Sequence, residues 1–147
     1  MRRVLLVTDG SPNALRAART AAQLAQRSRG EVLVIYVIPP VQALAKNTVS
    51  KGGAGLNTIV DALRDAMQMG HTALTQAANI LAQAGISHTA RLEQGVPATV
   101  ICQVSRSESC DAIVIGSANL DRTTTLALGE TSKRQNNCDS CAVIIVS

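Results

Sequence analysis

The sequence predicts an α/β fold in which an open parallel sheet carries helices on both faces. Four of its five strand-like segments are continuous apolar runs, as is typical of strands buried on both sides. Helical patterns alternate with these segments, which indicates parallel βαβ units with right-handed crossovers. The chain has one Tyr and no Phe or Trp, so its core has to be built from Val, Ile, Leu and Ala.

The five expected strands differ in their apolar pattern. The continuous runs are Val4–Thr8, Val32–Ile38, Ala112–Gly116 and Ala142–Val146. The fifth strand, Ser87–Glu93, alternates between polar and apolar residues. Such alternation suits a strand at the edge of the sheet.

Four helices are expected between the strands, and three of them have a regular apolar pattern. Ser11 can cap the first helix, with Pro12 in its first turn. A shorter helix follows the sequence Gly-Val-Pro at positions 95–97. The longest helix is expected at about Asn57–Ala84, and its apolar residues recur at helical steps that predict a buried stripe: Leu56, Ile59, Leu63, Met67, Gly70, Leu74, Ala78 and Leu81.

Residues 1–147 are expected to form a single domain, because a chain of 147 residues is an ordinary domain in size. Residues 39–56 have little periodicity and end rich in glycine, which predicts a mobile loop. No apolar residue occurs from Gly129 to Asn137. A helix in that stretch would have no apolar stripe to bury against the sheet.

Charge and hydropathy limit the classes of partner. No apolar run reaches the ~18–20 residues of a membrane span, and Val4–Val7 is too short for a signal-peptide core. We therefore expect a cytoplasmic protein with no membrane partner. The net charge is +4, but arginines 16, 19, 27 and 29 are spread along one helix without aromatic stacking partners. We interpret them as a solvated face and expect no nucleic-acid partner.

The four cysteines are interpreted as buried or incidental thiols. Cys138 and Cys141 have the CxxC spacing of a redox motif or half a metal site. Their motif enters a strand, however, whereas a thioredoxin-type thiolate is stabilised at a helix N-terminus. Cys102, Cys110 and the two histidines do not complete a zinc site. No metal site is expected.

Four segments together resemble the universal stress protein domain. They are Val7–Ser11 after the first strand, Glu93–Ile101 with its Gly-x-Pro sequence, Cys110–Ser117 with a strand ending IVIG, and the closing Cys141–Ser147. The resemblance covers essentially the whole chain. It implies a Rossmann-like fold of the adenine nucleotide alpha-hydrolase-like type, with strand order 3-2-1-4-5, in a usually dimeric protein of stress adaptation.

The resemblance also implies a nucleotide site, since ATP-binding members carry G-x2-G-x9-G-[S/T] after the fourth strand. Gly116 and Gly129 match the first and third glycines, with the nine-residue spacer kept. Asn119 stands in place of the second glycine and Glu130 in place of Ser or Thr. The frame of the motif is present, and two of its four contact positions are changed.

Glu130 is the more consequential change. A Ser or Thr there would donate hydrogen bonds to a phosphate at a helix start, whereas an ionised Glu only accepts them. Asn119 tolerates a positive φ better than most residues but adds a side chain where the backbone would approach a phosphate. Arg122 and Thr131 could compensate, and Mg²⁺ could bridge Glu130 to a phosphate.

The nucleoside end of the implied site lies at the strand ends. Asp9 occupies the position that contacts the nucleotide in binding members, and Val37 and Ile115 match apolar adenine-pocket positions. Val7 and Thr8 complete this candidate set. From the residues alone, Asp9 is equally an ordinary turn residue after a strand.

Two functions fit this pattern. The first is a homodimeric regulator or binding protein for unidentified client proteins, with a degenerate nucleotide site and little or no turnover. The second is an ATP-binding switch that uses the altered loop with Mg²⁺, with slow hydrolysis at most. No catalytic residue is assigned: the chain lacks GxGxxG after its first strand and lacks GxxxxGK[ST], and His71 and His88 are expected at the surface.

The last strand predicts dimerisation independently. It is apolar throughout and lies last in the implied strand order, at an open edge that native proteins usually protect. We expect antiparallel pairing across a two-fold axis through Val143, Ile144, Ile145 and Val146.

Overall fold

The computed structural model describes residues 2–44, 56–116 and 141–146. Its strands form one parallel sheet in the order β3-β2-β1-β4-β5, which confirms the predicted fold class and strand order. The strand bounds are β1 Arg3–Val7, β2 Glu31–Ile38, β3 His88–Gln94, β4 Ala112–Gly116 and β5 Ala142–Val146.

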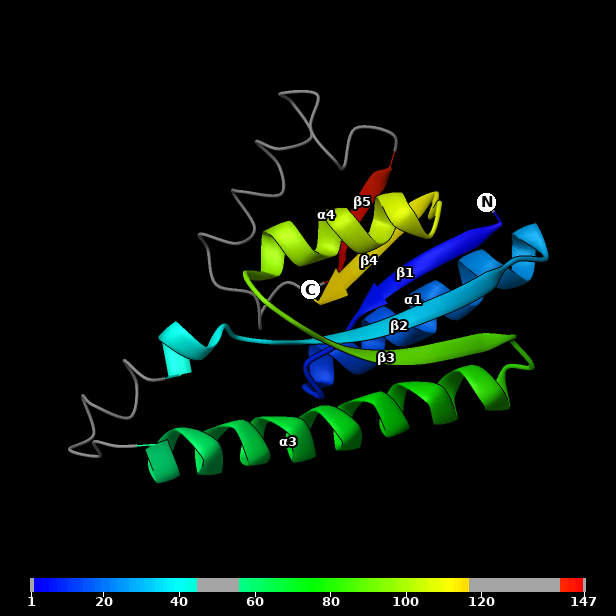
Figure 1. Cartoon of the computed structure of the whole chain (residues 1–147). Helices are drawn as coiled ribbons and strands as arrows, with labels where there is room; N and C mark the ends of the chain where they lie inside the picture. The colour runs from blue at the N-terminus through cyan, green and yellow to red at the C-terminus, as the bar shows by residue number, and fades with distance from the viewer. Residues whose placement is uncertain (1, 45–55, 117–140, 147) are drawn as a thin grey trace.

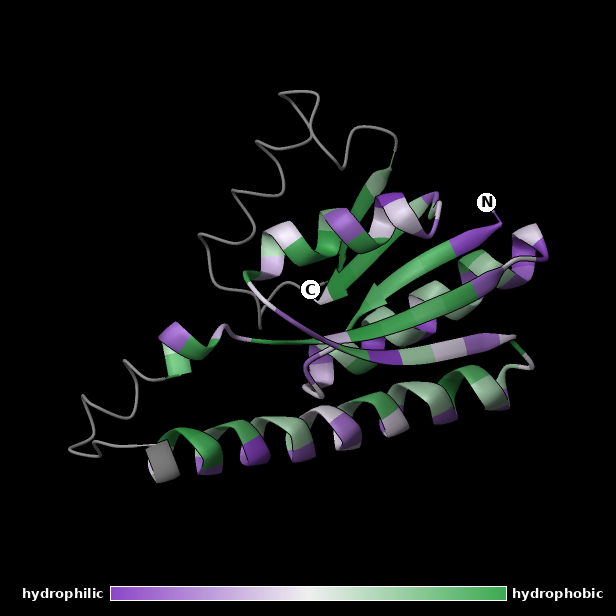
Figure 2. Cartoon of the chain, viewed as in Figure 1, coloured by the Kyte–Doolittle hydropathy of each residue, from purple (hydrophilic) through white to green (hydrophobic). Residues whose placement is uncertain are grey.

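Helices cover both faces of the sheet, as predicted (Figure 1). Helices α1, Pro12–Ser28, and α3, Leu56–Gln83, pack on one face. Helix α4, Pro97–Ser107, packs on the other. The strands β1, β2 and β4 are apolar along almost their whole length, whereas the helices expose polar residues outward (Figure 2).

Helix α1 begins as the sequence predicts. Ser11 is its N-cap, and the Ser11 Oγ accepts a hydrogen bond of 3.1 Å from the Ala14 N–H. The arginines of this helix are exposed, in agreement with a solvated face. The buried side of the helix consists of alanines, whose small side chains let the helix lie close to the sheet: Ala14, Ala17, Ala18, Ala21, Ala22 and Ala25.

The predicted stripe of α3 is buried only in its second half. Gly70, Leu74 and Leu81 are buried, but Met67 is 42% exposed. Length explains the difference: a helix of 28 residues spans about 42 Å, while the eight residues of β2 span about 26 Å. The first turns of α3 therefore extend beyond the sheet (Figure 1).

A helical turn occupies residues 41–44, where the sequence predicted a loop. The N–H groups of Ala43 and Leu44 both donate to the Pro40 carbonyl, at 2.9 and 3.1 Å, and Leu44 is buried. Four residues are too few to show a helical period, which is why the sequence pattern missed this turn. Residues 45–55 of the predicted loop lie outside the described residues, and Leu56 already belongs to α3.

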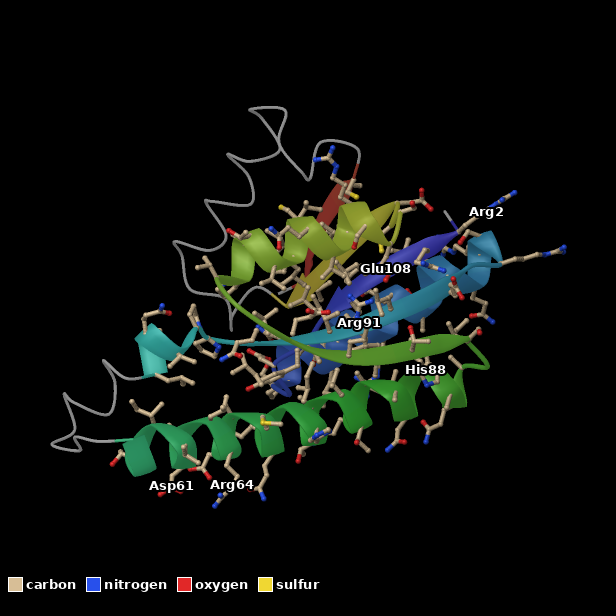
Figure 3. All side chains as sticks on the ribbon, in the orientation of Figure 1. Arg2, Asp61, Arg64, His88, Arg91 and Glu108 are labelled. Carbon is tan, nitrogen blue, oxygen red and sulfur yellow. The ribbon has the colours of Figure 1, made fainter. Side chains whose placement is uncertain are left out.

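An ion-pair network joins three strands to the end of α4. Arg3 on β1 pairs with Glu31 on β2 and with Glu108, at the C-terminal end of α4. Arg91 on β3 pairs with the same Glu108 at 2.6 Å and with Glu93 at 2.8 Å (Figure 3). One carboxylate thus connects the first and third strands across the α4 side of the sheet.

Asp111 supplies a pH-dependent contribution to stability. Its Oδ2 accepts hydrogen bonds from the Arg2 and Arg3 N–H groups at 2.7 and 3.2 Å, and these bonds lower the pKa of Asp111. Because the pKa of Asp111 is lower in the folded than in the unfolded protein, its carboxylate stabilises the fold at pH values above the unfolded pKa of about 3.9. This contribution is lost as the pH falls through the folded pKa.

We expect Asp111→Asn to lower the free energy of unfolding at neutral pH by at most about 1 kcal/mol, since the carboxylate is exposed. Urea unfolding at neutral pH and again at pH near 2 measures the effect. The difference between variant and wild type should shrink at the acidic pH. An equal difference at both pH values would contradict the role of the carboxylate charge.

Candidate functional site

The carboxyl ends of three adjacent strands meet at one edge of the sheet. Val7 at the end of β1 lies opposite Ile35 of β2 and Ile115 of β4. The chain leaves β1 toward α1 on one face, while α4 on the other face leads into β4. Open α/β sheets bind ligands at such a point, beyond the carboxyl ends of the strands.

A tight turn carries Asp9 at this edge. Thr8 is buried, its N–H donates to the Ile35 carbonyl at 3.0 Å, and its Oγ1 accepts from the Gly10 N–H at 3.2 Å. The Asp9 Oδ1 accepts from the Ser11 N–H at 3.0 Å. Gly10 has a φ of +81°, which a glycine adopts without strain. The turn therefore fixes the backbone of Asp9 and joins β1 directly to α1.

Gly116 lies against the first turn of α1. A Cβ added at Gly116 would be 2.8 Å from the Ala14 nitrogen and 2.8 Å from the Asn13 carbonyl carbon. The glycine is thus required for the packing of β4 on α1, apart from any role toward a ligand. The same contact brings the N-terminal end of a 17-residue helix to the strand ends. The positive end of its dipole favours an anion there.

The predicted apolar residues of the site differ in how far they reach the surface. Val7 and Ile115 are buried, with Ile115 only 1% exposed, and their side chains belong to the core beneath α4. Val37 is partly buried and packs at the margin of the same core. The side chain of Ile115 is therefore part of the core, while Val37 is partly accessible to solvent.

Among the described candidate residues, Asp9 is the polar residue whose side chain is exposed at the carboxyl ends of the strands. Its Oδ1 accepts from the Ser11 N–H, and no hydrogen bond joins its Oδ2 to another described residue. Asp9 also acts on Tyr36: burial, and then the negative charge of Asp9, raise the pKa of the Tyr36 hydroxyl. The second carboxylate oxygen can accept a hydrogen bond from an amino or hydroxyl group of a ligand.

The remaining candidate positions lie outside the described residues. They are the phosphate-loop positions after β4: Asn119, Arg122, Gly129, Glu130 and Thr131. Among the candidates that the structure does describe, Val7, Thr8 and Asp9 are brought together with Ile115 and Gly116. Val37 lies at the end of the neighbouring strand β2.

A cleft of about 570 Å³ opens between Asp9, Gly10 and α3. This cleft was not among the predicted sites, although polar residues spaced three and four apart along α3 were a signal for it. Val37 and Ile115 do not line this cleft, so it is separate from the predicted adenine positions. Its helical lining comprises Asp65, Gln68, Met69, Thr72, Ala73 and Gln76.

A second cleft, of about 660 Å³, lies at the opposite edge of the sheet, where Arg3, Glu31 and Glu108 form their ion pairs. Size alone would favour this cleft as the ligand site. The amino ends of the strands lie there, however, and parallel sheets bind ligands at the carboxyl ends. The strand-end position of Asp9 and Gly116 is therefore the better candidate.

Within residues 2–44, 56–116 and 141–146, no group of three or more His, Cys, Asp or Glu side chains could hold a metal ion. None of the helices in these ranges is long and apolar enough to cross a membrane.

The strand order, the crossover at β1 and the glycine-ended β4 define a Rossmann-like α/β protein of the adenine nucleotide alpha-hydrolase-like class. The sequence model of the universal stress protein family matches residues 1–147. The chain belongs to the universal stress protein family, as its motifs indicated.

Relatives support the same assignment. A universal stress protein of Thermus aquaticus is 30% identical over 144 residues, covering 97% of this chain and 96% of the relative. The universal stress protein of Archaeoglobus fulgidus in complex with dAMP has a TM-score of 0.64 at 21% identity, covering 100% of this chain and 98% of that one. A family member from Arabidopsis thaliana with AMP bound has a TM-score of 0.65 at 18% identity, with coverages of 99% and 91%.

Proposed function

We propose that this chain is a cytoplasmic, homodimeric stress-adaptation regulator that binds nucleoside monophosphates at least as tightly as ATP and has little or no turnover. The observation that carries the proposal is the contrast between the two ends of its site. At the nucleoside end, the exposed carboxylate of Asp9 can accept a hydrogen bond, and it follows β1, which lies between β2 and β4. The phosphate loop has Asn119 and Glu130 at two contact positions.

The nucleoside end has the chemistry that an adenosine group needs. The Oδ2 of Asp9, which has no hydrogen-bond partner within the described part of the chain, can accept one hydrogen bond from an amino or hydroxyl group. Val37 offers an apolar surface at the margin of the core, and Gly116 keeps the first turn of α1 nearby. The Archaeoglobus and Arabidopsis family members hold dAMP and AMP, each with a single phosphate.

The phosphate loop is less suited to a triphosphate. Two unit charges ~4 Å apart repel by roughly 4 kcal/mol at an effective dielectric of about 20, which is an upper figure for Glu130 beside a phosphate. Glu130 can turn toward solvent, so the penalty is smaller than this. AMP carries fewer phosphates toward the loop and avoids much of the repulsion.

The alternative function is an ATP-binding switch with slow hydrolysis at most. The spacing between Gly116 and Gly129 favours it, because the frame of the ATP motif is kept. In that case Arg122 would supply a cation and Mg²⁺ would neutralise charge between Glu130 and the phosphates. This alternative requires ATP binding that is tight with Mg²⁺ and weak without it.

Asp9→Ala tests the nucleoside end. We expect the variant to bind AMP about tenfold more weakly than wild type, because one charge-assisted hydrogen bond is lost. Isothermal titration calorimetry measures the affinities, and Asp9→Asn is the matched control, since it keeps an oxygen for the Ser11 N–H. The proposed site is wrong if wild type does not bind AMP, or if wild type and Asp9→Ala bind it equally.

The dimer is proposed to form through β5. Among the described residues, this strand pairs with β4 along one side only, and its Ile145 is 46% exposed. An unpaired apolar edge strand is one that native proteins usually cover, and a second copy can cover it by antiparallel pairing of Val143–Val146.

Ile145→Lys is expected to convert the dimer into a monomer, because it places two positive charges near the two-fold axis. Light scattering at micromolar concentration measures the mass. Met69→Lys is the control, since Met69 is 62% exposed on α3 and distant in sequence from β5. A monomeric wild-type protein would contradict the proposed interface.

A further inference from the structure

Cys110 and Cys141 precede adjacent strands of the sheet, β4 and β5. Ala112 lies opposite Ala142 in the parallel pairing, so Cys141 lies level with Asp111, one residue beyond Cys110. With strands ~4.8 Å apart and a rise of ~3.3 Å per residue, the two cysteine Cα atoms are about 6 Å apart. That separation is within the range of roughly 4.4–6.8 Å that a disulfide spans.

The two side chains also lie on the same face of the sheet. Cys110 is buried in the core beneath α4, and Cys141 packs against the same core. The Cys141 thiol donates to the Cys110 carbonyl at 2.8 Å, and its sulfur is 2.7 Å from the Ser105 Oγ. Both cysteines are free thiols. The contact with the Cys110 carbonyl places the Cys141 sulfur directly beside its neighbour.

We propose that Cys110 and Cys141 are an oxidation site, which a peroxide converts into a disulfide that joins the start of β4 to the start of β5. The pair lies at the amino ends of the strands, away from Asp9 and Gly116. The proposal is therefore independent of nucleotide binding.

The chemistry begins at Cys141, which is partly exposed whereas Cys110 is buried. The Cys141 sulfur attacks one oxygen of hydrogen peroxide, the O–O bond breaks, and a sulfenic acid and one water form. The Cys110 sulfur then attacks the Cys141 sulfur, and the sulfenic hydroxyl leaves with the Cys110 proton as a second water. Two thiols are oxidised and one peroxide is reduced to two waters.

Protonation explains why Cys110 acts second. Burial, and then the neighbouring Cys141, raise the pKa of the Cys110 thiol to about 11. A thiol that remains protonated is a poor nucleophile toward peroxide. The proximity of Cys110 to a sulfenic acid at Cys141 compensates for this low reactivity, because the condensation is intramolecular.

The disulfide would also restrain β5, the strand proposed to form the dimer interface. Cys141 immediately precedes β5, and the bond would fix the start of β5 to the turn between α4 and β4. The link would restrict the unfolded chain between positions 110 and 141, and would raise the midpoint of thermal unfolding by roughly 10 °C.

The test uses Cys102→Ser/Cys138→Ser, in which Cys110 and Cys141 are the remaining cysteines. The folded protein is treated with hydrogen peroxide, alkylated and mapped by mass spectrometry without reduction. We expect a peptide that links Cys110 to Cys141, loss of both free thiols, and reversal by dithiothreitol. Oxidation of Cys141 to a sulfinic acid with Cys110 still alkylated would overturn the proposal, as would a disulfide between two copies or no reaction.

Single substitutions in the same background assign the order of steps. Cys110→Ser should leave a sulfenic acid at Cys141 that dimedone traps, whereas Cys141→Ser should leave Cys110 unoxidised. If the background variant does not fold, the wild-type chain is mapped instead. Cys102 is already disulfide-bonded in the structure, which corrects the expectation that all four cysteines are thiols. Oxidation of the wild-type chain should therefore add the link between Cys110 and Cys141, and any pairing that separates Cys110 from Cys141 would refute the proposal.

Discussion

Gly116→Ala is expected to lower the free energy of unfolding by about 2 kcal/mol, because its new methyl group has no room. The atoms that would lie 2.8 Å from it are backbone atoms of Asn13 and Ala14, which cannot rotate away as a flexible side chain can. Helix α1 would have to shift from the end of β4. Since α1 follows Asp9 directly, the candidate site would change with it. Urea unfolding followed by circular dichroism measures the loss.

Gly85→Ala is the matched control for this effect. Gly85 has a φ of +72° and no heavy atom within 4 Å of an added Cβ, so its substitution introduces backbone strain without a steric clash. We expect a cost of about 1 kcal/mol there. A Gly116→Ala variant as stable as wild type would show that β4 and α1 do not pack as described.

Asn119→Gly/Glu130→Ser is expected to bind ATP at least tenfold more tightly than wild type, equivalent to about 1.4 kcal/mol. Glu130→Ser removes a negative charge beside the phosphates and supplies a hydroxyl donor. Asn119→Gly removes a side chain where the backbone would approach a phosphate. Titration calorimetry of both single variants should assign the larger gain to Glu130→Ser.

AMP provides the internal control for these variants. The changes lie in the phosphate loop, so the affinity for AMP should rise much less than the affinity for ATP. If the double variant gains nothing for ATP, the two substituted positions do not limit triphosphate binding. The loop would then work with Asn119 and Glu130 as they are, as the switch alternative requires.

The strands with continuous apolar runs could be predicted well, because such a run is typical of strands in a parallel sheet. The run of β5 predicted the strand correctly but not its burial, since β5 is only partly buried. Ala112–Gly116 and Ala142–Val146 were predicted with the bounds that the structure gives them. The edge strand β3 differs from its predicted bounds by one residue at each end, and so does the apolar strand β1. On α3, periodicity alone predicted Met67 as buried, since it cannot tell where the sheet beneath a helix ends.

Contacts between distant residues could not be predicted from local patterns. Arg91 and Glu108 meet only because β3 and the end of α4 lie near each other in the fold. The neighbouring positions of Cys110 and Cys141 depend on the register between β4 and β5, whereas the sequence spacing pointed to Cys138 as the partner of Cys141. The candidate nucleotide edge was predictable because strand order places Asp9 and Gly116 together.

The preference of the wild-type protein between AMP and ATP tests the central claim most directly. Titration calorimetry of the wild-type protein with each nucleotide, in the presence of Mg²⁺, gives the two dissociation constants. We expect the dissociation constant for AMP to be equal to or lower than that for ATP. ATP binding at least tenfold tighter than AMP binding, a difference of about 1.4 kcal/mol, would contradict a degenerate phosphate loop and favour the ATP-binding switch.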